Sequence, residues 1–217
     1  MIFPEHTYLQ PARQIAKKRF LQELSLGSPA RRSLDDDVHA IYWTASLKEA
    51  SLHLPPGKEV TEIEVFTLAL RQPHIDEALL TAIDRAIPYH ILYLLTYEGR
   101  TQAWISYKET AQANEAFRVE KYYHTDWQAA EELPLALRGT SLDEVYENLV
   151  CAIAGARLRL QGGSLRAAVQ ADEQRAAIEK EIAALTKKRN REKQLNRKME
   201  LNARIKKLRR ALQGVSP

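Results

Sequence analysis

The chain has 217 residues, 45% of them hydrophobic and 28% charged, which fits one folded domain of ordinary size with an appendage. No apolar run approaches the ~20 residues that span a bilayer, and the N-terminus lacks the basic-then-apolar order of a secretory signal. We therefore expect a cytoplasmic protein with no membrane contact. The single cysteine, Cys151, excludes an internal disulfide and a cysteine metal site.

The net charge of +4 conceals an uneven distribution along the chain. Residues 186–213 carry twelve Lys or Arg and two Glu, a net charge of +10, so the rest of the chain carries −6. A mildly acidic body with a strongly basic end is typical of a protein that binds an acidic partner, nucleic acid first. The basic segment is therefore the first place to look for function.

The N-terminal third predicts a helix and then a strand. An apolar face at helical spacing predicts the helix over residues 12–25. The polar stretch 31–37 reads as a connector. Alternating apolar and polar residues predict the strand over 39–47, and residues 52–54 are expected to extend it after a turn.

The middle of the chain predicts a β-α-β-β unit over residues 60–108. Its first strand, 60–70, is apolar on both faces in its second half, which indicates an interior strand. An amphipathic helix over 75–87 follows, and the strands 90–97 and 101–108 are joined by a tight turn. We expect the two strands that flank the helix to be parallel neighbours.

The body is expected to end on a last strand and a capped helix. Residues 117–124 predict the strand, after a loop or short helix at 109–116. Ser141, with a glutamate three residues later, has the pattern of a capping box and predicts a helix from 142 to about 160. The glycines 162 and 163 stop that helix and mark the expected domain boundary.

Residues 165–213 contain no proline or glycine and read as one long helical segment. It carries two apolar seams that are out of phase by two residues in the heptad. A continuous helix would reach ~73 Å, against a radius of gyration of ~15 Å for the body, and would need a partner chain. The alternative is an antiparallel hairpin that turns near Asn190. The seams are Ile178–Ile182–Leu185 and Leu201–Ile205–Leu208–Leu212.

Together these elements predict an α+β fold in two parts. Residues 1–163 form a mixed β-sheet body that contains the β-α-β-β unit. Residues 164–217 form a basic helical arm, either a coiled coil or an antiparallel helical hairpin.

Six short stretches, in order along nearly the whole chain, resemble a known family. They are similar to the bacterial domain of unknown function numbered four-three-nine-one. Members of that family have no established activity, so the resemblance brings no active site with it. It implies a setting near helicases and DNA methyltransferases of restriction or phage-defence systems, and an accessory role beside such a protein partner. The stretches are Glu62–Phe66, Ile87–Leu92, Ser106–Lys108, Thr125–Trp127, Leu142–Glu147 and Glu192–Asn202.

The first candidate site is a set of cations on the arm that are suitable donors to phosphate. No aromatic residue lies in 165–217, so DNA binding there would be electrostatic and independent of base sequence. The simpler interpretation is a solvated helix face. The predicted nucleic-acid-binding residues are Lys187, Lys188, Arg189, Arg191, Lys193, Arg197 and Lys198.

The second candidate site lies among the same residues and favours a protein partner or a second copy of the chain. Polar residues within a helical seam fix register and partner choice, so we expect a homodimer or a heteromeric contact through the arm. The predicted partner-binding residues are Gln194, Leu195, Asn196, Met199, Glu200 and Asn202.

The alternative function is a metal-dependent nuclease of the restriction-endonuclease type. Asp35, Asp36 and Asp37, followed by Glu62 and Glu64, loosely match its acid and Glu-x-Lys arrangement, but no lysine lies two residues after either glutamate. These glutamates are more simply polar residues on the exposed half of a strand. The six histidines lack the spacing of metal ligands, and no phosphate-binding loop is present. We therefore expect a non-catalytic adaptor without metal or cofactor.

Overall fold

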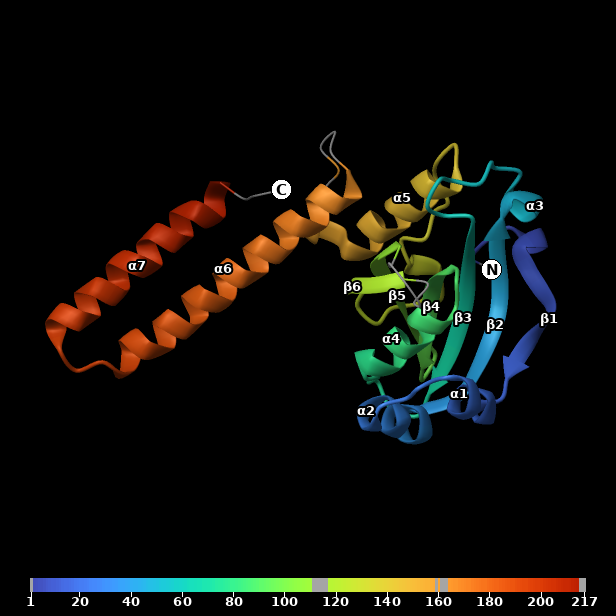
Figure 1. Ribbon diagram of the computed structural model, residues 1–217, viewed down its shortest axis with the longest axis horizontal. Coiled ribbons are helices and arrows are strands. Elements are labelled where there is room, and N and C mark those ends of the chain that lie inside the picture. Colours follow the sequence, from blue (N-terminus) through green and yellow to red (C-terminus); the bar gives the residue numbers. More distant parts are fainter. Residues whose placement is uncertain (1, 111–116, 159, 161–163, 215–217) are drawn as a thin grey trace. The chain divides into compact units, whose positions relative to one another are not determined.

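The computed structural model describes residues 2–110, 117–158, 160 and 164–214 (Figure 1). Two compact units make up the chain, Met1–Gly155 and Ala156–Pro217. The boundary predicted at the glycines 162 and 163 lies outside the described residues, as does most of the loop or short helix predicted at 109–116.

The first unit is built on a mixed six-stranded sheet whose strands follow chain order. β3 and β4 run parallel, whereas the pairs β1–β2, β2–β3, β4–β5 and β5–β6 are antiparallel. The helix α4 (Glu77–Ala86) connects the parallel pair, so the predicted β-α-β-β unit is confirmed. The strands are β1 (Tyr8–Ile15), β2 (Val38–Lys48), β3 (Glu62–Leu70), β4 (His90–Tyr97), β5 (Arg100–Thr110) and β6 (Phe117–His124).

Side-chain alternation gives the sheet two buried faces. Phe66 and Leu68 of β3 pack in one apolar cluster with Ile83 of α4. The opposite face meets α5 (Leu142–Ala154), where the rings of His90 and Tyr146 lie 4.4 Å apart and the Tyr146 hydroxyl donates a hydrogen bond to the sheet backbone. β3 is thus covered on both sides, as its apolar sequence predicts.

The N-terminal region departs from the sequence prediction. The helix expected over 12–25 is wrong over its first five residues, because residues up to Ile15 belong to β1, which pairs with β2. Only α1 (Lys17–Glu23) is helical there, and the backbone pairing offered by β2 overrides the helical spacing. The expected connector 31–37 is also wrong, since α2 (Ser28–Arg32) continues into a π-helical turn, Ser33–Asp37.

Two further boundaries differ from the prediction for local reasons. A short helix, α3 (Glu49–Leu52), replaces the expected strand extension, because the Ser51 hydroxyl accepts the N–H of Lys48 and closes a helical turn. The Ser141 cap is confirmed, and its Oγ accepts the N–H of Glu144 at 3.4 Å. The helix it opens ends early, at Gly155, whose φ of 60° suits a glycine.

The second unit is an antiparallel helical hairpin of α6 (Leu165–Arg191) and α7 (Leu195–Gly214), which confirms the hairpin and excludes the single long helix (Figure 1). Its two apolar seams lie at equal distances from residue 193 in the sequence, so they face each other when the chain reverses there. Because they lie on two separate helices, they do not have to follow one continuous heptad repeat. Ile205 is 3% exposed. Arg204 and Glu181 form an ion pair between the two helices at 2.6 Å. No helix in the described ranges is long and apolar enough to cross a membrane.

A buried ion pair joins α4 to the far strands of the sheet. Lys108 Nζ lies 2.9 Å from Asp84 Oδ1, and both side chains are fully buried. The Tyr122 hydroxyl donates to the other carboxylate oxygen, and Lys108 also donates to the Tyr89 carbonyl at 2.6 Å. Burial lowers the pKa of Lys108 from its ordinary value, and the Asp84 carboxylate opposes this effect.

We expect Asp84→Ala to reduce the free energy of unfolding by about 3–5 kcal/mol, because it leaves the buried Lys108 cation without its carboxylate. Urea denaturation at pH 7 measures this change. The matched control is Glu23→Ala, which removes the exposed Arg19–Glu23 pair and should cost no more than about 1 kcal/mol. Equal effects of the two substitutions would contradict a structural role for the buried pair.

Candidate functional site

The hairpin turns at Glu192–Gln194, two residues beyond the predicted Asn190. The Glu192 carboxylate accepts the N–H groups of Lys193 at 2.8 Å and Gln194 at 2.9 Å, and Gln194 is the N-cap residue of α7, whose N–H has no partner within the helix. The hydrogen bond from Gln194 is the main reason that the pKa of Glu192 is lowered, with Lys193 and nearby cations adding to it. This glutamate cap explains how the chain reverses without glycine or proline.

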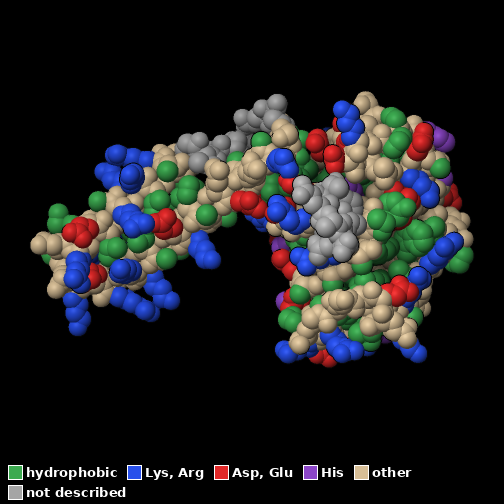
Figure 2. Space-filling model, in the orientation of Figure 1, with side chains coloured by type: hydrophobic (Ala, Val, Ile, Leu, Met, Phe, Trp, Pro, Cys, Tyr) green, Lys and Arg blue, Asp and Glu red, His purple; other side chains and the backbone are tan. Residues whose placement is uncertain are grey.

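The seven predicted nucleic-acid-binding residues all lie around this turn. Six of them are exposed and form no ion pair with a described acidic residue. Arg189 is half-buried, and its guanidinium donates to Asn190 at 2.8 Å and to Asn202 at 3.2 Å. We call the exposed six the tip cations, and Figure 2 shows Lys and Arg side chains gathered on the hairpin. The tip cations are Lys187, Lys188, Arg191, Lys193, Arg197 and Lys198.

The predicted partner-binding residues lie on the same end of the hairpin. Leu195 is 70% and Met199 61% exposed, the highest values among the large hydrophobic side chains that the structure describes. Gln194, Asn196 and Glu200 are also exposed. Asn202 is exposed too, but its side-chain oxygen accepts the bond from Arg189 that links the two helices. The apolar pair is therefore open to a partner, whereas Asn202 also holds the hairpin together.

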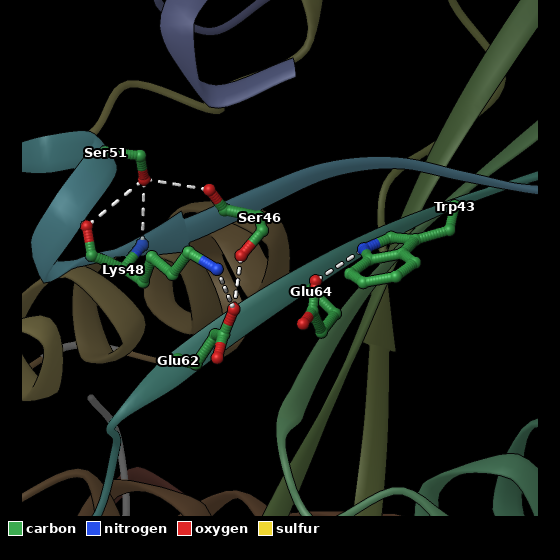
Figure 3. Close-up of polar contacts among 6 residues, drawn as sticks. All are labelled: Trp43, Ser46, Lys48, Ser51, Glu62 and Glu64. Carbon is green, nitrogen blue, oxygen red and sulfur yellow. Dashed lines mark hydrogen bonds and ion pairs between the residues drawn. The ribbon is translucent and has the colours of Figure 1, made fainter. Parts of the chain in front are cut away.

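A polar cluster on β2 and β3 contains the two glutamates of the nuclease hypothesis (Figure 3). Trp43 Nε1 donates to Glu64 Oε2 at 2.6 Å. The Ser46 hydroxyl donates to Glu62 Oε1, and Lys48 Nζ lies 3.3 Å from the same oxygen. Antiparallel pairing builds the cluster, since Ser46 is opposite Glu64 and Lys48 is opposite Glu62.

The expected exposure of Glu62 and Glu64 is wrong. Glu64 is only 5% exposed, and the Glu62 side chain only 16%. Trp43 and the β2 side chains cover them, and the Arg13 guanidinium of β1 lies 5.4 Å from the Trp43 ring centre. The sequence did not reveal Lys48, because only the strand register brings this lysine beside Glu62.

The structure does not bring the aspartates of the nuclease hypothesis to these glutamates. Asp37 lies at the other end of β3, where its carbonyl accepts the N–H of Arg71 at 2.7 Å. The six residue-to-residue steps from Glu64 to Leu70 span roughly 20 Å of strand. The Asp37 carboxylate is occupied by the Ser33 hydroxyl and the Gln72 amide. Among the described residues, no group of three or more His, Cys, Asp or Glu side chains is placed to hold a metal ion.

Residues 1–212 match a family described as a domain of unknown function (DUF4391). The chain belongs to the DUF4391 family. No curated protein and no solved structure matches it. The resemblance noted from six short stretches is thus confirmed over nearly the whole chain.

In this DUF4391 chain, the buried Glu64 has a raised pKa. Burial is the main cause that raises the pKa of Glu64 to about 7 from an ordinary value of 4.5, the Glu62 carboxylate raises it further, and the Trp43 hydrogen bond opposes both. The folded chain therefore keeps a proton on Glu64 in a pH range where the unfolded chain has lost it. The stabilisation that Glu64 contributes is therefore lost as the pH rises from about 4.5 to 7. The buried His90 acts in the opposite direction: burial lowers its pKa to about 3 from an ordinary value of 6.5, so its contribution is lost as the pH falls through this range.

We expect Glu64→Gln to remove the Glu64 contribution to the pH dependence and to leave that of His90, since the amide is neutral and its oxygen still accepts the Trp43 N–H. At pH 8 the variant should be more stable than the wild type by up to about 3 kcal/mol, and at pH 4.5 the two should be nearly equal. Urea denaturation between pH 4.5 and 8.5 gives both curves. Glu173→Gln, at an exposed position of α6, is the control and should leave the wild-type slope. Parallel curves for wild type and Glu64→Gln would refute the assignment.

Proposed function

We propose that this DUF4391 chain is a non-catalytic adaptor whose hairpin tip docks the body on an anionic partner, a protein in the first place. The observation that carries the proposal is the group of six exposed tip cations, none of which forms an ion pair with a described acidic residue and which have only Glu192 as an acidic residue at the turn itself. A hollow of ≈ 350 Å³ on α6 lies among them, lined by Ala184, Lys187, Lys188, Arg191 and Glu192.

Helix electrostatics separate four of the six tip cations into two pairs. Lys188 and Arg191, in the last turn of α6, lie where a helix dipole favours positive charge, so stability alone accounts for them. Arg197 and Lys198 lie in the first turn of α7, which holds no acidic residue and where the dipole disfavours positive charge. The positive charges of Arg197 and Lys198 therefore destabilise the N-terminus of α7. Binding to an anionic surface is a physical reason for cations at this position.

The exposed apolar pair favours a protein over nucleic acid. Cations and hydrogen-bond donors contact phosphate, but Leu195 and Met199 offer nothing to a sugar–phosphate backbone. The arm also carries no aromatic residue on which bases could stack. A protein surface, by contrast, gains from burying both groups, and methionine is frequent at such contacts. DNA is therefore the second partner that we propose.

The setting follows from the family resemblance alone. We propose that the partner is a helicase or DNA methyltransferase of a bacterial restriction or phage-defence complex, with the chain acting in the cytoplasm. A second copy of the chain is a weaker proposal, because two tips that each carry six exposed cations repel one another. No cofactor enters this proposal.

A divergent metal-dependent nuclease is the second function that we consider. Lys48 beside Glu62 supplies, from the neighbouring strand, the lysine that the Glu-x-Lys spacing lacks. Against it, the aspartates lie at the far end of β3, and both glutamates are occupied by side chains of the cluster. We therefore rank it below docking. Cleavage of DNA with Mg²⁺ or Mn²⁺ that Glu62→Ala abolishes would reverse this order.

Replacing all six tip cations by glutamine should abolish docking. The tagged chain is purified from its native cells, with and without nuclease treatment, and the co-purified protein is quantified. We expect at least about a tenfold loss of nuclease-resistant partner, since each exposed charge contributes only a fraction of a kcal/mol but the six act together.

The matched control removes six exposed cations from the first unit, which gives the same change in net charge. These are Lys18, Arg31, Arg32, Lys58, Arg100 and Arg138. It should retain the partner. Full retention by the tip variant would show that the tip is not the docking element, and loss of all captured protein after nuclease would show that DNA is the tether.

A further inference from the structure

A second heptad stripe runs along the outside of α7, beside the seam that closes the hairpin. Its members repeat at intervals of four, three, four and three, the spacing at which one helix packs along another. All five are exposed, whereas Leu201, Ile205, Leu208 and Leu212 of the seam are buried or half-buried. We call this set the outer stripe: Leu195, Met199, Asn202, Lys206 and Arg209.

Helix geometry separates the outer stripe from the hairpin seam. At 100° per residue, the mean direction of the stripe lies about 110° from that of the seam. Leu195 and Met199 therefore cannot join the contact between α6 and α7 without unwinding α7. Their exposure of 70% and 61% agrees with this geometry. α7 thus presents one face to α6 and a second, heptad-spaced face to solvent.

We infer that the outer stripe of α7 is the docking surface for an acidic amphipathic helix of a partner protein, which completes a three-helix bundle with α6 and α7. This inference rests on the proposed docking function and specifies the partner's chemistry. Leu195 and Met199 bury against the apolar positions of that helix. Asn202 lies in the middle of the stripe. Its side-chain oxygen accepts the bond from Arg189 of α6, and its amide N–H groups set the register with the partner helix, as a single polar seam residue does in coiled coils.

Charge complementarity identifies the partner helix as acidic. Lys206 and Arg209 belong to the stripe, and Lys198 and Arg210 flank it at neighbouring angles of the helix. None of these four side chains forms an ion pair with a described acidic residue. Glutamate or aspartate flanking the apolar positions of the partner would pair with them, as charged residues beside a coiled-coil seam do.

The spacing also favours a helix over the other anionic surfaces. A phosphate backbone or a lipid surface does not require apolar side chains at heptad intervals. A membrane-binding face usually carries aromatic residues, and the arm has none. A straight partner helix, in contrast, meets every member of the outer stripe along its length.

The test uses the full chain and a defined probe. The probe is a labelled synthetic helix of about four heptads, with leucine at the a and d positions and glutamate at most others. Fluorescence anisotropy measures its binding at low salt and at about 0.5 M salt. We expect Leu195→Gln combined with Met199→Gln to weaken binding at least about tenfold at both. Circular dichroism should be unchanged, because both side chains are exposed.

Adjacent lysines of α7 provide a matched pair of variants. Lys206 lies in the outer stripe, while Lys207 lies outside it, and both are exposed. Lys206→Gln and Lys207→Gln remove the same charge from the same helix. The inference requires a clearly larger loss of probe binding for Lys206→Gln. Equal losses would show that charge alone attracts the probe and would overturn it.

Further outcomes separate this inference from the proposed function. If the glutamine variants at 195 and 199 bind the probe normally while the six-cation variant does not, the docking function stands and the outer stripe is wrong. Tighter binding of duplex DNA or of phosphatidylserine vesicles than of the probe, at equal salt, also overturns the inference. The co-purification experiment, which does not use the probe, decides the docking function by itself.

Discussion

The body depends on the burial of β3 on both faces. β3 carries apolar side chains on both faces, so it lies inside the sheet and not at its surface. Its neighbours are β2 and β4, and its two faces are covered by α4 and α5. Polar groups drawn into this core must then be paired. Glu64 is paired with Trp43, and Asp84 with Lys108 and Tyr122. Both clusters are consequences of the same burial, and each satisfies its own hydrogen bonds.

The arm follows a different constraint, the closure of two short apolar seams. Neither α6 nor α7 has enough apolar surface to be stable alone, and reversal at Glu192 brings the seams together. That reversal also places the C-terminal cations of α6 beside the N-terminal cations of α7. The turn is thus the reason that the positive charges gather at the tip of the hairpin. The same geometry leaves Leu195 and Met199 on the outside, six and two residues before Leu201, the first residue of the α7 seam.

Prediction from the sequence succeeded where a pattern repeats within one element. The strand alternation around β2, the amphipathic spacing of α4 and the Ser141 cap each depend on neighbouring residues, and each is confirmed. Prediction failed where a residue far away in the sequence determines the secondary structure or the burial. Residues 12–15 fit the helical pattern of the residues that follow, but pairing with β2 makes them part of a strand. Glu62 and Glu64 look like surface residues until Trp43, 21 positions from Glu64, covers the latter.

The sequence by itself determined the α+β class, the parallel β3–β4 connection, the concentration of positive charge in residues 186–213 and the membership in the DUF4391 family. These properties depend on composition and local periodicity, which do not require contacts between residues far apart in the chain. Only the tertiary structure decided between one long helix and a hairpin, because no glycine or proline marks the turn and Glu192 makes it through backbone hydrogen bonds. It alone also placed Lys48 beside Glu62 and separated the outer stripe from the seam, since strand register and helix pairing arise from contacts between residues far apart in the chain.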